Sequence, residues 1–142
     1  MQRLLVIDDE PGIRFSVEQV FEQAGIEVFT AGSGEEGLRV AGEKMPDVIL
    51  LDIRLGRCSG LELFHELSRV DPRASIIFIT GHGTADAACE ARTLGAYEYL
   101  VKPLDAVQLQ HVVHRALATS HSVPAPAMKP EGRRLQSRPT EG

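Results

Sequence analysis

The sequence predicts an α/β fold: a five-stranded parallel sheet with helices on both faces. Apolar runs of strand length occur without polar alternation, which is typical of strands covered on both sides. The clearest run, residues 48–51, reads Val-Ile-Leu-Leu and ends at the carboxylate of Asp52. Each run is followed by a segment with helical spacing, so strand and helix alternate five times. Right-handed crossovers between parallel strands then leave few topologies.

The predicted strands are short and rich in valine, isoleucine and leucine, the composition expected of buried strands. They comprise residues 4–7, 26–29, 48–51, 75–79 and 97–101. Capping residues place the first two helices. Pro11 suits the first turn of a helix that can stop at Gly25. Ser33 and Glu36 form a capping box that opens the second helix, which should stop before Pro46.

Three further helices follow from the same signals. A loop over residues 53–59 leads into a helix with Leu61, Phe64 and Leu67 on one face. Thr84 can cap a fourth helix whose apolar side is mostly alanine, and small side chains bury little area, so we expect this helix to be weakly anchored. Asp105 can cap the last helix.

The length of the chain indicates one domain, and its charge argues against nucleic-acid binding. We expect a folded domain over residues 1–118 and a flexible linker or tail over residues 119–142, where prolines, serines and arginines gather. Of the net charge of −5, this tail carries +2, which leaves −7 on the domain. An acidic domain offers no electrostatic footprint for nucleic acid, so we expect no direct nucleic-acid binding by this chain.

The sequence also lacks membrane and export signals. No apolar run approaches the ~18 residues that cross a bilayer, and the N-terminus has no signal-peptide pattern. Cys58 and Cys89 match no metal or redox spacing and are interpreted as reduced thiols. We therefore expect a cytoplasmic protein.

Polar residues follow four of the predicted strands at the point where each strand ends. They are Asp8-Asp9, Asp52, Thr80 and Lys102. Because the carboxyl ends of parallel strands share one rim, where open α/β sheets place ligands, these groups should meet. Three carboxylates held together repel one another and need a cation or a raised pKa.

This constellation indicates phosphoryl chemistry with magnesium. Oxygen ligands with one lysine nearby fit Mg²⁺ better than zinc or iron. Asp52 would be the nucleophile that becomes an aspartyl phosphate. Such transfer needs mainly positioning and charge neutralisation, which Mg²⁺ and Lys102 can supply, while the Thr80 hydroxyl donates a hydrogen bond to a phosphoryl oxygen.

With these residues in place, the chain resembles a response-regulator receiver domain of two-component signalling over residues 3–118. The stretch 80–103 is similar to receivers of the nitrogen-regulator (NtrC) class, which commonly precede an ATPase domain that activates an alternative sigma factor. The resemblance implies the flavodoxin-like receiver fold with strand order 2-1-3-4-5. It also implies that residues 119–142 lead to an effector domain, and that the chain regulates transcription through it.

The resemblance implies specific roles. Asp52 would accept phosphate from a histidine kinase or phosphotransfer protein, so the chain is expected to be no conventional enzyme but a phosphoacceptor that catalyses its own phosphorylation and dephosphorylation. Asp9, Asp52 and the main-chain carbonyl of Arg54 would hold Mg²⁺, with Asp8 acting through water. The bond between Lys102 and Pro103 is typically cis in this family.

The resemblance also implies a switch. Thr80 would be drawn to the phosphate and Tyr99 would turn into the vacated space, which changes the face made by the fourth helix, fifth strand and fifth helix. A weakly anchored fourth helix suits that motion. The same face is a candidate homodimer interface. Tyr99 can equally be an ordinary edge-strand aromatic.

One position departs from the receiver pattern, and two others near Thr80 bear on access to the site and on its chemistry. Receivers usually have proline four residues after the nucleophile, where this chain has Gly56, so the Arg54 loop is expected to be more mobile and Mg²⁺ binding weaker. Gly81 has no side chain to cover the site, which predicts good access for small phosphodonors. His82 lies near enough in sequence to tune the lifetime of the phosphorylated form.

Other readings remain open. A haloacid-dehalogenase-like phosphatase needs a second acid two residues after the nucleophile, where this chain has Arg54. A flavodoxin-like electron carrier shares the sheet order, but the acids of residues 8–10 would repel a flavin phosphate. A stand-alone phosphotransfer receiver, or a degenerate one used only for protein interaction, is the remaining alternative.

Overall fold

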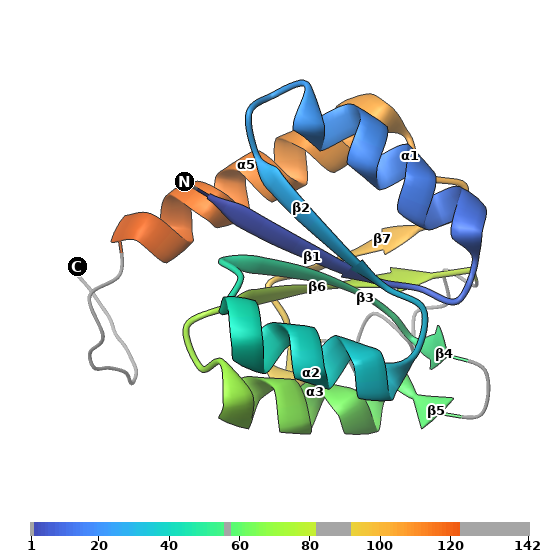
Figure 1. The fold of residues 1–142 in the computed structure, drawn as a ribbon, viewed down its shortest axis with the longest axis vertical. Helices are drawn as coiled ribbons and strands as arrows, with labels where there is room; N and C mark the ends of the chain where they lie inside the picture. Colours follow the sequence, from blue (N-terminus) through green and yellow to red (C-terminus); the bar gives the residue numbers. More distant parts are fainter. Residues whose placement is uncertain (1, 56–57, 82–91, 123–142) are drawn as a thin grey trace.

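The computed structural model describes residues 2–55, 58–81 and 92–122. Within them lies one five-stranded sheet of order β2-β1-β3-β6-β7, parallel throughout (Figure 1), which confirms the predicted fold and strand order. Its strands are β1 (Arg3–Ile7), β2 (Glu27–Ala31), β3 (Val48–Asp52), β6 (Ser75–Thr80) and β7 (Glu98–Val101).

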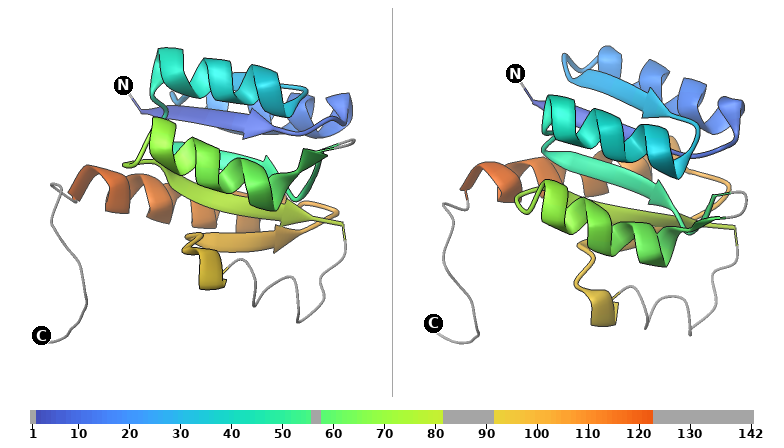
Figure 2. Two further views of the ribbon diagram at one scale, coloured as in Figure 1. Left: turned by 90° about the horizontal axis from the view of Figure 1, so that it is seen from below. Right: turned by 60° about the horizontal axis from the view of Figure 1, so that its bottom comes forward.

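Helices cover both faces of this sheet (Figure 2). One face carries α1 (Pro11–Glu22) and α5 (Ala106–Ser122), and the other carries α2 (Gly34–Lys44) and α3 (Gly60–Val70). Alternate strand residues enter two separate cores: Leu4 and Val6 pack beneath α1 and α5, whereas Leu5 and Ile7 pack beneath α2 and α3. Burial on both sides explains the unbroken apolar runs. None of the described helices is long and apolar enough to cross a bilayer.

The second helix shows how local sequence sets element boundaries. Ser33 Oγ accepts from the backbone N–H of Glu36 at 3.2 Å, and Glu36 Oε1 accepts from the N–H of Gly32 at 2.8 Å, so the predicted capping box forms one residue wider than usual. The helix ends at Met45, which adopts a left-handed conformation with φ 47° just before Pro46. These caps fix where the chain re-enters the sheet.

The segment after β3 differs from the predicted loop. It forms a short antiparallel pair, β4 (Arg54–Leu55) and β5 (Cys58–Ser59), in which Arg54 pairs with Ser59. The N–H of Gly60 then donates to the carbonyl of Ile53 at 2.7 Å, which closes the hairpin beside Asp52. Strands of two residues are too short to carry a hydrophobic pattern, so no sequence signal predicts them.

Two predictions fall wholly or partly outside the described residues. The fourth helix was expected over residues 84–94, of which residues 92–94 are described and are helical. At the C-terminus α5 continues to Ser122, past the predicted domain boundary at residue 118, and residues 123–142 of the predicted tail are not described. The division of the chain at residue 118 stays a prediction.

Candidate functional site

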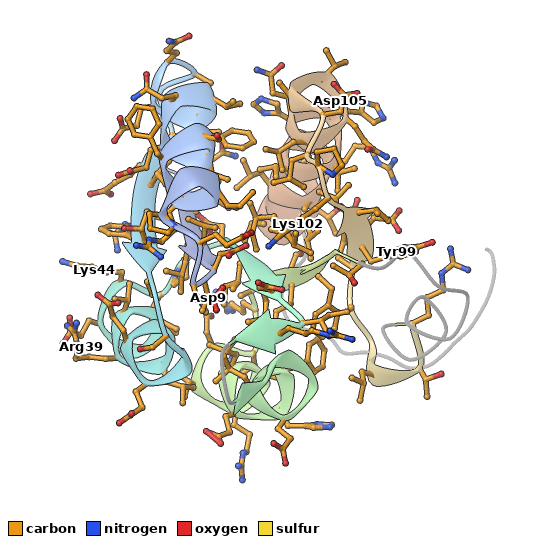
Figure 3. The ribbon with its side chains drawn as sticks, turned by 90° about the vertical axis from the view of Figure 1, so that its right-hand side faces the viewer. Asp9, Arg39, Lys44, Tyr99, Lys102 and Asp105 are labelled. Carbon is orange, nitrogen blue, oxygen red and sulfur yellow. The ribbon has the colours of Figure 1, made fainter. Side chains whose placement is uncertain are left out.

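The polar residues predicted to meet do lie at one edge of the sheet. Asp8 and Asp9 follow β1, Asp52 ends β3, Thr80 ends β6, and Lys102 follows β7. Figure 3 looks onto this edge, with Asp9 and Lys102 between α1, α5 and the lower pair of helices. The parallel register brings them together, because Asp52 pairs with Ile79 and Thr80 with Val101.

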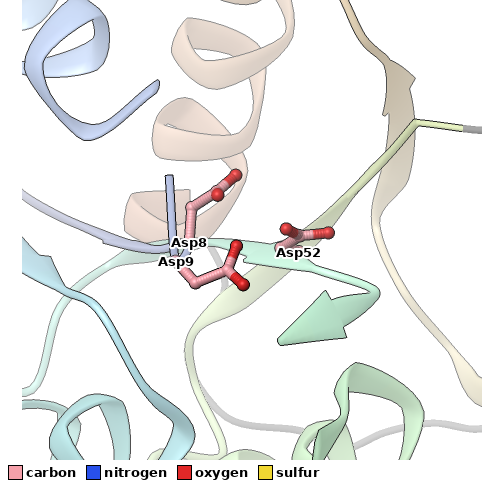
Figure 4. A group of neighbouring side chains, drawn as sticks. All are labelled: Asp8, Asp9 and Asp52. Atoms are coloured by element: carbon pink, nitrogen blue, oxygen red, sulfur yellow. The ribbon is translucent and has the colours of Figure 1, made fainter. Parts of the chain in front are cut away.

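Three carboxylates form the centre of the site (Figure 4). Asp8 and Asp52 are buried and Asp9 is exposed, and one oxygen from each lies within 4.8 Å of the others. Backbone N–H groups orient the buried pair: Glu10 donates to Asp8 Oδ1 at 2.9 Å, and Arg54 donates to Asp52 Oδ1 at 3.0 Å. The first contact comes from the start of α1 and the second from β4, so both local structures fix the cluster.

Lys102 is the cation of the site. Its Nζ lies 3.1 Å from Asp8 Oδ2, 3.3 Å from Asp52 Oδ2 and 2.6 Å from Glu10 Oε1. Partial burial alone would lower the pKa of Lys102. The contacts with Glu10 and Asp8 and the negative charge of Asp52 outweigh that effect and hold the pKa above its usual range. Lys102 therefore stays protonated as a counter-charge. The bond from Lys102 to Pro103 is cis, as the family resemblance implied.

The Asp52 carboxyl group has a raised pKa. Burial raises its pKa from 3.8 to about 6; the N–H of Arg54 lowers it, the charge of Asp8 raises it further, and Lys102 lowers it. The pKa-lowering effect of Lys102 is therefore smaller than the combined pKa-raising effects of burial and of the neighbouring Asp8 carboxylate. A nearby divalent cation would favour the ionised, nucleophilic form.

The donor set fits a hard divalent cation such as Mg²⁺. All three side chains offer carboxylate oxygens, the ligands that Mg²⁺ prefers. Among the described residues, Asp8 Oδ2 is buried and pairs with the Lys102 ammonium at 3.1 Å but accepts no well-aligned hydrogen bond, so it can also accept a cation. Asp8, Asp9 and Asp52 would hold the ion. The main-chain carbonyl of Arg54 as a further ligand stays a prediction.

Gly60 allows the start of α3 to pack closely against the end of β3, which carries Asp52. A Cβ at this position would collide with the main-chain atoms of Asp52 and Ile53. Any side chain there would push the β3 end out of place. Gly60 was not among the predicted site residues, and its only signal in the sequence was its position at the start of a helix a few residues after Asp52.

Two other residues at the site were missed. Glu10, at the start of α1, reaches Lys102, and Arg14 donates from Nη1 to the main-chain carbonyl of Asp8 at 2.6 Å. The Arg14 guanidinium also passes Gly32, where a Cβ would lie 3.1 Å from Nη1. Glu10 adjoins the predicted acids and Arg14 follows one turn later, so only proximity in sequence could have pointed to them.

The predicted switch residues are placed as follows. Thr80 is buried at the end of β6, and Tyr99 is half-buried on β7, at the edge of the core beneath α2 and α3 (Figure 3). Gly81 is exposed, and within the part of the chain that the structure describes a Cβ there would meet nothing within 4 Å. The predicted access for small phosphodonors stays a prediction. Gly56 and His82 lie outside the described residues, so the predictions made for them stay untested.

A doubly wound parallel sheet with acids and a lysine at its carboxyl edge defines a receiver-like α/β domain. The family description "Response regulator receiver domain" matches residues 4–114. The chain therefore belongs to the response-regulator receiver family, as the sequence motifs indicated.

Within the family, the chain resembles NtrC-type receivers. It is 37% identical over 120 residues to the DNA-binding transcriptional regulator NtrC of Escherichia coli strain K12, covering 83% of this chain and 26% of NtrC. NtrX of Brucella abortus, solved in complex with ADP, superposes with a TM-score of 0.79 at 35% identity, covering 85% of this chain and 28% of NtrX. The chain thus spans about a quarter of these regulators.

A shorter relative is also similar. Sporulation initiation phosphotransferase F of Bacillus subtilis strain 168 is 29% identical over 116 residues, which cover 82% of this chain and 94% of that protein. Receivers of this family therefore occur both as parts of long regulators and as proteins little longer than the domain itself.

Proposed function

We propose that this chain is a phosphoryl-accepting switch of a two-component system, with Asp52 as the phosphoacceptor. The proposal rests on one observation: the buried carboxylate of Asp52 belongs to a cluster of three acids at the sheet edge and lies 3.3 Å from the Lys102 ammonium. A histidine kinase or phosphotransfer protein would supply the phosphoryl group. The chain catalyses its own modification and its own dephosphorylation, and it turns over no separate substrate.

The residues divide the chemistry between them. One Asp52 oxygen attacks the donor's phosphorus; the bond to the donor's leaving atom breaks, and that atom departs with the electron pair. Lys102 neutralises charge on the phosphoryl oxygens, and the Thr80 hydroxyl donates to one of them. Asp8 and Asp9 hold a divalent cation with Asp52, and when bound this cation neutralises further phosphoryl charge.

The experiment that tests this assignment is phosphorylation by acetyl phosphate in the presence of Mg²⁺, followed by intact mass spectrometry. Wild type is expected to gain the mass of one phosphoryl group, and Asp52→Asn to gain none. Chelation with EDTA should abolish the modification. Wild-type protein that stays unmodified, or Asp52→Asn protein modified to the same extent, would contradict the proposal. Steady hydrolysis of phosphate esters would instead favour a phosphatase.

Phosphorylation is proposed to alter the face formed by the fourth helix, β7 and α5, through Thr80 and Tyr99. One exposed valine on that face, Val101 of β7, favours its use as a contact surface. It lines a groove with Gln108 and Val112 of α5, and an exposed apolar side chain there is stabilised when it is covered. We expect homodimerisation to increase with the phosphate mimic beryllofluoride, measured by sedimentation velocity. Replacing Val101 by serine should weaken this dimer, and a sedimentation coefficient unaffected by beryllofluoride would contradict it.

The output is proposed to be transcription regulation through an effector domain, because the relatives of NtrC type are transcriptional regulators. Similarity to sporulation initiation phosphotransferase F favours a second candidate, a stand-alone phosphotransfer role. The two are distinguished by incubating phosphorylated protein with a histidine phosphotransfer domain. Return of the phosphoryl group to histidine supports the second role, and retention on Asp52 supports the first.

A further inference from the structure

Glu10 makes an unusual contact for a residue at the start of a helix. It occupies the N-cap position of α1, yet its side chain forms no capping hydrogen bond with that helix. Instead Oε1 accepts from Lys102 Nζ at 2.6 Å, across 92 positions of sequence. The glutamate thus connects the loop after β1 to the loop after β7 directly above the carboxylate cluster.

This contact is the shortest that Lys102 makes with an acid. The ammonium group has three N–H donors, and three carboxylates surround it: Asp8 at 3.1 Å, Asp52 at 3.3 Å and Glu10 at 2.6 Å. An incoming phosphoryl oxygen must therefore displace one of them. Asp8 and Asp52 are buried at strand ends, whereas the Glu10 side chain is 60% exposed. Glu10 is the partner that can leave.

We infer that Glu10 is a positioning residue that holds the Lys102 ammonium in the unphosphorylated protein and, by competing for it, slows phosphorylation by free anionic phosphodonors. This inference rests on the proposed phosphoacceptor role of Asp52. The Glu10 carboxylate also adds a negative charge to the mouth of a site that already holds three acids, so a donor dianion is repelled on approach. A donor of lower negative charge experiences less of this repulsion.

The test compares Glu10→Gln with wild type in the initial rate of modification by acetyl phosphate and Mg²⁺, measured by intact mass. Exposed ion pairs contribute at most about 1 kcal/mol, so at low salt the variant should react about two- to fivefold faster. Raising ionic strength from about 0.05 M to about 0.5 M should narrow the difference, because screening weakens the repulsion. With phosphoramidate, which carries less negative charge than acetyl phosphate at neutral pH, Glu10→Gln should exceed the wild-type rate by a smaller factor.

The matched control is Glu22→Gln, which removes one exposed carboxylate from the far end of the same helix. It should react at the wild-type rate with both donors. Glu10→Ala should change in the same direction as Glu10→Gln, and a merely structural role would produce neither the salt dependence nor the donor dependence. Equal or slower reaction of Glu10→Gln at low salt, with wild type modified normally, overturns this inference alone. Wild type that accepts no phosphate overturns both proposals.

Discussion

Asp71 is a buried carboxyl group near the edge of the sheet opposite the candidate site. It lies between α3 and β6 and is 3% exposed, and among the described residues its Oδ2 has no hydrogen-bond partner. Burial raises its pKa from 3.8 to about 6; the charge of Asp47 acts in the same direction, and Arg73 opposes it. The folded state therefore disfavours the ionised form relative to the unfolded chain.

Because the pKa of Asp71 is raised in the folded state, this group makes the free energy of unfolding depend on pH. Below about pH 3 the carboxyl group is mostly neutral in both states and does not affect the free energy of unfolding. As pH rises from about 4 to 6 the unfolded chain gains the free energy of ionisation first, so this group reduces stability and keeps doing so above pH 6. Asp71→Asn should raise the free energy of unfolding at pH 7 by about 2–3 kcal/mol, with a gain that shrinks towards pH 4.

Urea denaturation at several pH values measures this difference. Glu66→Gln, which neutralises an exposed acid on α3, is the matched control and should change stability little. A gain for Asp71→Asn that is equal at pH 4 and pH 7, or absent at pH 7, would show that the buried carboxylate does not limit stability.

At the scale of elements, the packing of α2 on β1 depends on one glycine. A Cβ at Gly37 would lie 2.5 Å from Ile7 Cδ1 and 2.9 Å from its Cγ1, closer than packed atoms allow. On the same helix, a Cβ at Gly42 would meet only Val70 Cγ1 at 3.5 Å, an ordinary contact. The two glycines share one helix but differ in what they face.

Alanine at these two positions should therefore have opposite effects. Gly37→Ala forces α2 or Ile7 to shift and should destabilise the protein by about 1–3 kcal/mol. Gly42→Ala fits and gains helix propensity, so it should stabilise by up to about 1 kcal/mol. Thermal denaturation of both variants is the measurement. If both variants change the melting temperature in the same direction, the close approach of Gly37 to Ile7 does not determine how α2 packs on β1.

The main elements could be predicted from sequence because each has a signal of its own. Strand β3 is apolar on both faces, and Ser33 with Glu36 marks the start of α2. The hairpin of β4 and β5 could not be predicted, because it holds only two residue pairs and no hydrophobic face. Its role is also local: it supplies the Arg54 N–H that orients Asp52.

At the scale of the molecule, the site could be predicted wherever topology alone brings residues together. Asp52, Thr80 and Lys102 meet because parallel strands end at one edge. The contact between Glu10 and Lys102 is different, since an exposed glutamate carries no pattern that identifies a partner 92 positions away. The burial of Asp71 could not be predicted from the sequence either, because an acid followed by proline is typical of an exposed turn.

The carboxylate cluster makes the stability of the whole fold depend on divalent cations. Asp8, Asp9 and Asp52 repel one another in the folded chain and separate when it unfolds, and an ion that binds only the folded form stabilises it by mass action. At a hundredfold excess over its dissociation constant this amounts to about 2.7 kcal/mol, which is several degrees in melting temperature for a domain of this size.

Mg²⁺ should therefore raise the melting temperature above that in NaCl of equal ionic strength, and EDTA should reverse the gain. Asp9→Asn separates ion binding from general salt effects: because Asp9 is exposed, its replacement removes repulsion at little structural cost, so the metal-free variant should melt no lower than wild type. The added stability from Mg²⁺ should shrink in the same variant, since one ligand is gone. Identical melting of wild type in MgCl₂ and in NaCl would mean that the three carboxylates do not form a cation site.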